Sequence, residues 1–383
     1  MNKKILYFPL VLLFMASGKL PAQNKSAGIN LSIWKGVNTQ PADSTQTTYF
    51  NLGILSAMNR LNGAGFNVFG SIIGGNMNGI QVSGLANMVG GSMRGVQLSG
   101  ISNINGNNMA GVSATGLVNI AGNQSRGILL SGMTSISGNN TSGVMASGIM
   151  NVSGDEVNGV HLAGVANVTG ATFNGVMAGG LLNVVGEHLN GVQISALANI
   201  VASRMNGVQI GLGNYATKAK GVQIGLVNYY KSEMKGFQLG LINANPDTKV
   251  QMMIYGGNAT KTNVGARFRN KLFYTIVGAG THYLDFSDKF SATLFYRGGI
   301  WLPLRKDLTI SGDLGYQHIE TFKNKDYGIP ARLYGLQARL NLEYQITKKF
   351  GVFATGGYGG SRYYNKDITY DKGVIAEAGI ILF

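Results

Sequence analysis

A sixteen-residue pattern repeats without interruption through the middle of the chain, and it limits the possible folds more than any other feature of the sequence. Eight consecutive units of this length begin at Gly79, and shorter relatives of the unit begin at Gly207, Gly221 and Gly236. Short repeats of this kind are stable only when neighbouring units stack on one another. The eight units read GIQVSGLANMVGGSMR, GVQLSGISNINGNNMA, GVSATGLVNIAGNQSR, GILLSGMTSISGNNTS, GVMASGIMNVSGDEVN, GVHLAGVANVTGATFN, GVMAGGLLNVVGEHLN and GVQISALANIVASRMN.

The sixteen positions of the unit define sixteen columns with different residue preferences. Column 1 is always Gly, and columns 6 and 12 are Gly in seven of the eight units, which suits sharp backbone corners. Columns 2, 7 and 10 hold Val, Ile, Leu or Met, so we expect them to form the inner core. Columns 3, 8 and 14 vary in residue type, so we expect them to face outward.

Column 9 is Asn in seven of the eight units, and Ser135 is the exception. Amides stacked at the strand spacing of about 4.8 Å hydrogen-bond to one another and to turn backbone. We therefore expect a structural asparagine ladder inside the stack. Its members are Asn87, Asn103, Asn119, Asn151, Asn167, Asn183 and Asn199.

Three short β segments separated by glycine corners predict a parallel β-solenoid over residues 63–245, in which about eleven coils make a rod roughly 50 Å long. The alternative is an antiparallel meander in which every unit crosses a membrane. Phe173 is the only Phe, Tyr or Trp between Gly79 and Asn206, whereas lipid-facing barrels carry aromatic girdles. This scarcity favours the solenoid.

The composition changes after Asn245-Pro246. Residues 250–383 contain 22 aromatic residues and long stretches that alternate with period two between apolar and polar side chains. This pattern predicts a small antiparallel, outer-membrane-type β-barrel over residues 246–383, with a soluble barrel or sandwich as the alternative. About eight strands are expected, near 250–258, 262–269, 271–283, 289–303, 307–318, 332–345, 349–362 and 373–383.

Five charged residues fall on the polar face of these predicted strands. The interior of an eight-stranded barrel is narrow and filled by side chains, and buried charges must pair. We expect an internal ion network that plugs the barrel, with a small catalytic or conducting site as the alternative. The residues are Arg297, Asp313, Arg339, Glu343 and Glu377.

The first 22 residues have the pattern of a signal peptide. Lys3 and Lys4 precede an apolar run from Ile5 to Ala16, and Leu20-Pro21-Ala22 forms a plausible cleavage site. We therefore expect an exported protein. Residues 23–62 contain two further strands, 28–37 and 47–57, which either complete the barrel or cap the solenoid.

The compact units GVQIGLVN, from Gly221, and GFQLGLIN, from Gly236, resemble a family of exported bacterial surface-repeat proteins. The resemblance covers roughly residues 79–244, and the sixteen-residue units depart from the compact form. A last strand that ends in Phe383 resembles the ending of bacterial outer-membrane barrels. These resemblances imply a location in the outer membrane or at the cell surface, and no established biochemical activity.

The sequence has few of the residues and motifs that are typical of enzyme active sites. It has no Cys, and its four His are scattered; His161 and His188 are expected to be outward and solvated. No metalloprotease, phosphate-loop or nucleophile-elbow motif occurs. We expect no catalytic residue, no cofactor, no cofactor-binding residue and no metal site.

The net charge of +15 is concentrated after Gly207. An exported basic chain meets anionic lipid head groups before nucleic acid, so no nucleic-acid partner is expected. The last repeats carry a group of lysines that either contact lipid phosphates or form a solvated edge. They are Lys218, Lys220, Lys231, Lys235 and Lys249.

The sequence therefore predicts a non-catalytic outer-membrane protein with a structural or binding role, of which adhesion is one form. Its expected partners are outer-membrane lipid and an unknown surface protein or glycan. The alternative is a small transport or channel barrel that carries a periplasmic solenoid scaffold. The parity of the barrel strands decides which side of the membrane the solenoid occupies.

Overall fold

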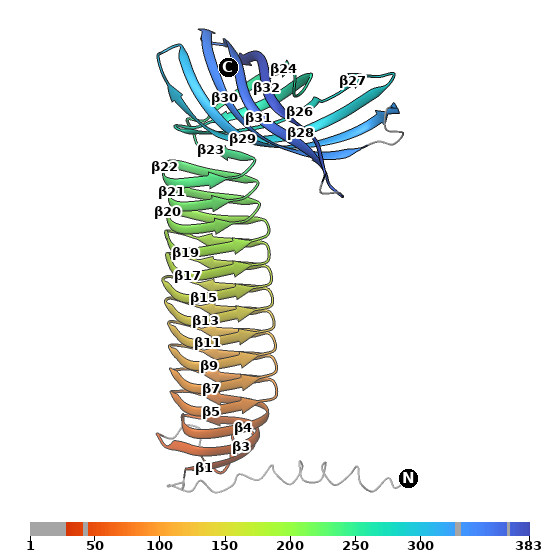
Figure 1. The fold of residues 1–383 in the computed structure, drawn as a ribbon. Coiled ribbons are helices and arrows are strands. Elements are labelled where there is room, and N and C mark those ends of the chain that lie inside the picture. Colours follow the sequence, from red (N-terminus) through yellow and green to blue (C-terminus); the bar gives the residue numbers. More distant parts are fainter. Residues whose placement is uncertain (1–27, 41–44, 326–330, 366–367) are drawn as a thin grey trace, which may run out of the picture. The chain divides into compact units, whose positions relative to one another are not determined.

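The computed structural model describes residues 28–40, 45–325, 331–365 and 368–383. It confirms the predicted fold class, with a parallel β-solenoid of about 12 turns followed by a closed antiparallel barrel of eight strands (Figure 1). The predicted signal peptide, residues 1–22, lies outside the described residues. Two compact units divide the chain. The first runs to Gly211 and includes Tyr215–Gly221, and the second combines Leu212–Asn214 with Val222–Phe383.

Each solenoid coil consists of one long and one short strand, so the prediction of three short β segments per coil is wrong. In β7 (Met93–Ser99) the chain runs from column 15 through the glycine of column 1 to column 5, and β8 (Ser102–Asn105) covers columns 8 to 11. Neighbouring coils pair in parallel with an offset of one repeat, as in Met93↔Met109 and Asn103↔Asn119. Every column of the sequence repeat is therefore a physical stack of side chains.

The same two-strand coil recurs along the first unit. The long strands are β5 (Met77–Ser83), β7, β9 (Met109–Thr115), β11 (Ser125–Ser131), β13 (Thr141–Ser147), β15 (Val157–Ala163), β17 (Thr172–Gly179) and β19 (His188–Ser195). The short strands are β6 (Ala86–Val89), β8, β10 (Val118–Ala121), β12 (Thr134–Ser137), β14 (Met150–Ser153), β16 (Ala166–Thr169) and β18 (Leu182–Val185).

Longer strands follow where the repeat loses its glycine at column 12. Ala202 stands at that position, and β20 (Ala198–Ile210) continues through the corner as one strand. The strands β21 (Gly213–Ile224) and β22 (Val227–Leu239) are similarly uninterrupted, and β23 (Ile242–Ala244) is the last strand of the solenoid. The strand therefore continues through a corner that lacks glycine.

The strands near the N-terminus belong to the solenoid sheet. β1 (Ile29–Trp34) pairs in parallel with β3 (Thr47–Met58), and β3 pairs in parallel with β4 (Arg60–Ile73). The two-residue strand β2 (Val37–Asn38) folds back on β1. The predicted strands 28–37 and 47–57 therefore lie at the end of the solenoid and are not part of the barrel.

The glycine of column 1 is required by both conformation and space. Gly95 has φ +126°, and a Cβ there would overlap the carbonyl oxygen of Gly79 in the preceding coil. An L side chain rarely adopts this φ. The column therefore bends the long strand in every coil and brings successive backbones close together.

The predicted inner and outer columns are partly reversed. Column 3 was expected to face outward, but Gln81 and its counterparts are fully buried. Columns 2 and 7 were expected inside, but Ile80 is 45% and Leu197 is 51% exposed. Successive residues of a strand point to opposite faces, so the buried asparagines of column 9 force column 10 outward. The interior consists mainly of columns 3, 9, 11 and 15, and column 5 adds buried residues such as Ser83 and Ser147.

The barrel is closed by eight long antiparallel strands, and the pairing of β24 with β32, for example Tyr255↔Gly379, completes the ring (Figure 1). The short strand β27 (Leu284–Asp285) pairs only with the start of β28. The ring consists of β24 (Lys249–Gly257), β25 (Thr262–Arg269), β26 (Phe273–Thr281), β28 (Lys289–Pro303), β29 (Leu308–Asn324), β30 (Arg332–Thr347), β31 (Phe350–Tyr363) and β32 (Thr369–Leu382).

Alternation along the barrel strands separates an apolar wall from a filled interior. The outward residues Leu314 and Leu340 are 72% and 66% exposed, whereas Asp313 and Arg339 on the same two strands are buried. Part of the interior is apolar and contains a core cluster. Its members are Met253, Tyr255, Tyr274, Ile276, Phe295, Phe353 and Ile381.

Candidate functional site

The polar residues inside the barrel form three buried ion pairs. Arg267 binds Glu343 through two parallel hydrogen bonds, with Nη1 donating to Oε1 at 2.7 Å and Nη2 to Oε2 at 2.9 Å. Arg297 binds Asp313 in the same two-point manner, with both distances 2.8 Å. These are charge-assisted, geometrically constrained contacts of the strongest kind.

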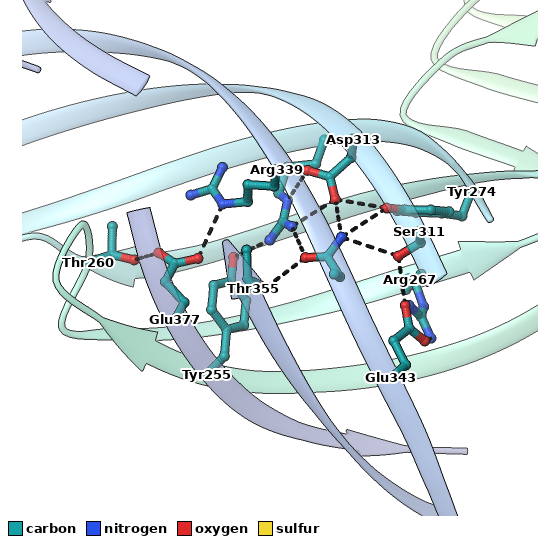
Figure 2. A network of polar contacts seen from close by, with 12 residues as sticks. Tyr255, Thr260, Arg267, Tyr274, Ser311, Asp313, Arg339, Glu343, Thr355 and Glu377 are labelled. Atoms are coloured by element: carbon teal, nitrogen blue, oxygen red, sulfur yellow. Dashed lines mark hydrogen bonds and ion pairs between the residues drawn. The ribbon is translucent and has the colours of Figure 1, made fainter. Parts of the chain in front are cut away.

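The third ion pair joins Arg339 to Glu377, whose Oε2 accepts from Nε at 3.2 Å (Figure 2). The other carboxylate oxygen of Glu377 accepts from the Thr260 hydroxyl at 2.9 Å. All six charged residues are at most 5% exposed. Three arginines and three carboxylates leave the network with no net charge.

Neutral side chains link the ion pairs to one another. Tyr274 Oη donates to Asp313 at 2.8 Å, and Asn341 Nδ2 donates to the same oxygen at 2.9 Å (Figure 2). Thr355 then donates to Asn341 Oδ1 at 2.6 Å, and Ser311 donates to Glu343 at 2.9 Å. Each carboxylate is therefore held by an arginine and at least one neutral donor.

This arrangement suits structural support better than chemistry. A general base or a metal ligand needs a carboxylate with a free lone pair that faces a substrate or an ion. Here the oxygen atoms of all three carboxylates already accept hydrogen bonds from side chains of the barrel strands and of the turn at Thr260. Among the described residues, no group of three or more His, Asp or Glu side chains is placed to hold a metal ion.

The structure brings together all five charged residues that the sequence places on the inward face, which are Arg297, Asp313, Arg339, Glu343 and Glu377. It adds Arg267, which the sequence analysis missed. Its position between the apolar neighbours Ala266 and Phe268 on β25 is the signal that would have placed it on the inward face.

The asparagines of column 9 are buried and hydrogen-bonded along the stack. Asn151 Nδ2 donates to Asn167 Oδ1 at 2.9 Å, and Asn167 donates to Asn183 at 2.9 Å. Each amide also reaches a backbone carbonyl of column 4 in the next coil, as in Asn167 to Ala178 at 2.8 Å. The carbonyl bond recurs at Asn87, Asn103, Asn119, Asn183 and Asn199. The direct amide chain is interrupted between Asn103 and Asn119, which Ser113 bridges, and at Ser135.

A second amide ladder runs along column 3, which the sequence analysis placed outside. Gln97 Nε2 donates to Gln81 Oε1 at 2.9 Å, and Gln209 donates to Gln193 at 2.9 Å. Between these pairs the column contains no Gln. The intervening side chains are Ser113, Leu129, Met145, His161 and Met177.

His161 is fully buried, contrary to the expectation that it is outward and solvated. Alternation along β15 turns column 3 into the core, and burial lowers the pKa of His161 to about 4. His188 is only partly buried, as its place at the coil corner requires. Neither His282 nor His318 hydrogen-bonds to the three ion pairs of the barrel.

The outer surface of the solenoid carries an apolar groove along the stack in the first unit. It has a volume of about 920 Å³, and its lining lacks charged side chains. Column 4 supplies small and large residues in alternation along it: Ala114, Leu130, Ala146, Leu162, Ala178 and Ile194.

The predicted lysines of the last repeats are all exposed. Lys235 lies 3.3 Å from Glu233, and both side chains are largely solvated. A contact between these lysines and lipid phosphate stays a prediction. The residues concerned are Lys218, Lys220, Lys231, Lys235 and Lys249.

Within the second unit, the last coil is hydrogen-bonded to one end of the barrel. Asn270, in the turn between β25 and β26, donates to the Asn243 carbonyl at 2.8 Å and accepts from Asn245 at 2.9 Å. Tyr296 Oη donates to the Gly240 carbonyl at 2.8 Å. The end of the asparagine ladder is therefore covered by polar groups rather than left open.

No protein-family model, no curated protein and no solved structure matches this chain. Within the described part of the chain, no helix is long and apolar enough to cross a membrane.

Proposed function

We propose that this protein is a non-enzymatic outer-membrane protein in which a sealed barrel anchors a periplasmic solenoid scaffold. The observation that carries the proposal is the contrast between the two faces of the barrel. Its outward wall is apolar, while its interior is occupied by three ion pairs and an aromatic core. In a soluble barrel such an apolar exterior would be exposed to water, and exposed apolar patches favour aggregation.

Aromatic side chains at both ends of the barrel support membrane insertion. Phe273 and Tyr344 lie at one end of their strands and are 53% and 47% exposed. Phe286 and Phe322, at the opposite end, are 66% and 56% exposed. Two aromatic belts that flank an apolar band are typical of transmembrane barrels.

The lengths of the connections support a periplasmic position for the solenoid. The chain enters β24 and leaves β32 at the same end of the barrel, because eight strands is an even number. At that end the connections are residues 270–272, 304–307 and 348–349, and at the other end they are 258–261, 282–288, 325–331 and 364–368. Short turns face the periplasm in bacterial outer-membrane barrels. This favours a scaffold inside the envelope over an adhesin at the cell surface.

The packed interior argues against a channel. Water and ions would need to displace the bidentate Arg267–Glu343 pair, whose partners lie on opposite sides of the lumen, on β25 and β30. Vesicle flotation establishes insertion, and planar-bilayer recording then measures conductance. We expect inserted protein to be electrically silent, and discrete conductance steps would instead support the transport alternative.

An epitope inserted between Asn139 and Asn140, at an exposed solenoid corner, tests the side of the membrane. We expect antibody labelling only after the outer membrane is permeabilised. The matched control is the same epitope in the longer connection at residues 282–288, at Ser287, which we expect to be labelled on intact cells. Labelling of the solenoid epitope on intact cells would overturn the periplasmic scaffold and restore the adhesin.

A further inference from the structure

Three consecutive coils place a sulfur, an imidazole and a second sulfur in one buried stack. Met145 pairs in register with His161, and His161 pairs in register with Met177. All three side chains are 0% exposed. Since paired strands lie about 4.8 Å apart, the two flexible thioether side chains are long enough to reach the ring between them.

The imidazole of His161 is not satisfied by the protein. Neither ring nitrogen has a hydrogen-bond partner among the described residues. The ring packs edge-on against Phe173, at 5.3 Å between centroids and 73° between planes, and an aromatic ring supplies no acceptor in the ring plane. Other polar members of the same column are paired, as Gln97 is to Gln81. A buried, unpaired polar group of this kind calls for a physical reason.

The donor set selects a narrow class of ligand. One neutral imidazole nitrogen and two thioether sulfurs are soft donors without charge, a set that suits Cu(I) and other soft ions rather than Mg²⁺ or Ca²⁺. A dry core without a carboxylate also favours a monovalent over a divalent cation, because the uncompensated charge is smaller. Met177 Sδ accepts a weak contact from Gln193 Nε2 at 3.6 Å, which an ion would displace.

We propose that Met145, His161 and Met177 form a binding site for a soft monovalent cation, Cu(I) or its redox-inert analogue Ag(I), inside the solenoid. The site goes beyond the proposed scaffold role and does not depend on membrane insertion. Loading requires local opening of the stack, so the ion exchanges slowly.

The repeat itself supplies replacements that the stack already tolerates. Column 3 holds Gln and Leu in other coils, so His161→Gln, Met145→Leu and Met177→Leu keep the packing type. Matched controls are Met109→Leu, a buried methionine of column 15, and His188→Gln at a corner. The full chain is titrated with silver nitrate in chloride-free buffer, with hours of equilibration at each step.

We expect the wild type to bind one equivalent of Ag(I). His161→Gln is expected to weaken binding at least about 100-fold and each Met→Leu variant about 10-fold, while both controls bind as the wild type does. Loss of a residue that only orients a metal ligand commonly weakens metal binding about 10- to 100-fold, and loss of a ligand is expected to cost at least as much. Uptake that is equal in wild type and His161→Gln would show adventitious binding by other methionines and would overturn the site, since the chain has 15 Met and only two of them belong to it.

X-ray absorption of the Cu(I)-loaded wild type tests the same site without a variant. One nitrogen and two sulfur scatterers are expected at the copper. A sulfur-only or oxygen-only environment, or a wild type that takes up no ion, would overturn the proposal.

Discussion

At the scale of single residues, the solenoid core accepts polar side chains wherever the stack supplies a partner. Asn167 accepts from one neighbour in the ladder and donates to the next and to the Ala178 carbonyl, so its burial leaves no amide group unpaired. His161 has the same burial without such partners. A buried polar residue is therefore destabilising in this repeat only where the neighbouring coils supply no hydrogen-bond partner for it.

We expect the free energy of unfolding of the solenoid to decrease as the pH is lowered, because His161 is buried in its neutral form. Its pKa is about 4 in the folded chain and 6.5 in an unfolded one, so unfolding takes up a proton between these values. The stabilisation is complete above pH 6.5 and is lost as pH falls toward 4. This difference corresponds to about 3 kcal/mol. Urea unfolding in metal-free buffer at pH 7 and pH 4.5 measures it.

The control is His161→Gln, which lacks the titrating ring and has the side chain that column 3 most often carries. The difference in unfolding free energy between wild type and variant should shrink or reverse as the pH falls. A difference that is independent of pH would mean that His161 is not held neutral by burial.

At the scale of the elements, each coil depends on close backbone approach at its glycine corners. We expect Gly95→Ala to destabilise the solenoid by at least about 2 kcal/mol, since it combines a positive φ with overlap against the Gly79 carbonyl. Gly74→Ala is the matched control, because its Cβ would meet only the Asn59 side chain at 3.9 Å. Thermal unfolding followed by circular dichroism compares the two, and equal effects would contradict the account of the corners.

The barrel strands depend on one another through their internal charges. We expect Arg297→Met to cost about 3–5 kcal/mol, because Asp313 would stay buried without its cation. Adding Asp313→Leu should restore much of that loss. Arg332→Met, which breaks an exposed pair with Glu320, should cost less than about 1 kcal/mol. Unfolding in detergent measures all three, and a double variant as unstable as Arg297→Met would contradict the role of charge pairing.

At the scale of the whole molecule, the sequence was sufficient for the fold class and for the strands of the barrel, but not for the two-strand division of each solenoid coil. The predicted barrel strand 262–269 coincides with β25, and 289–303 coincides with β28. Alternation also placed Asp313 and Arg339 inside, because charged residues on a strand with an apolar opposite face have only one favourable side.

The sequence was not sufficient for the inner face of the solenoid. Column 2 is Val or Ile, whereas column 3 is Gln in several units. Hydrophobicity alone therefore assigns column 2 to the core and column 3 to the surface. Stacking reverses that assignment, since a Gln such as Gln97 finds its partner one coil away and loses little on burial. The burial of His161 was missed for the same reason.

The membrane anchor requires that the outward wall of the barrel faces lipid, and a spin label on that wall tests this most directly. The chain has no Cys, so Leu340→Cys and the control Asn139→Cys each introduce a single labelling site. The protein is reconstituted in vesicles, and electron paramagnetic resonance measures collisions of each label with oxygen and with a water-soluble nickel chelate. We predict that the label at 340 collides with oxygen and is shielded from nickel, while the label at 139 behaves oppositely. Equal access of nickel to both labels would contradict the membrane anchor.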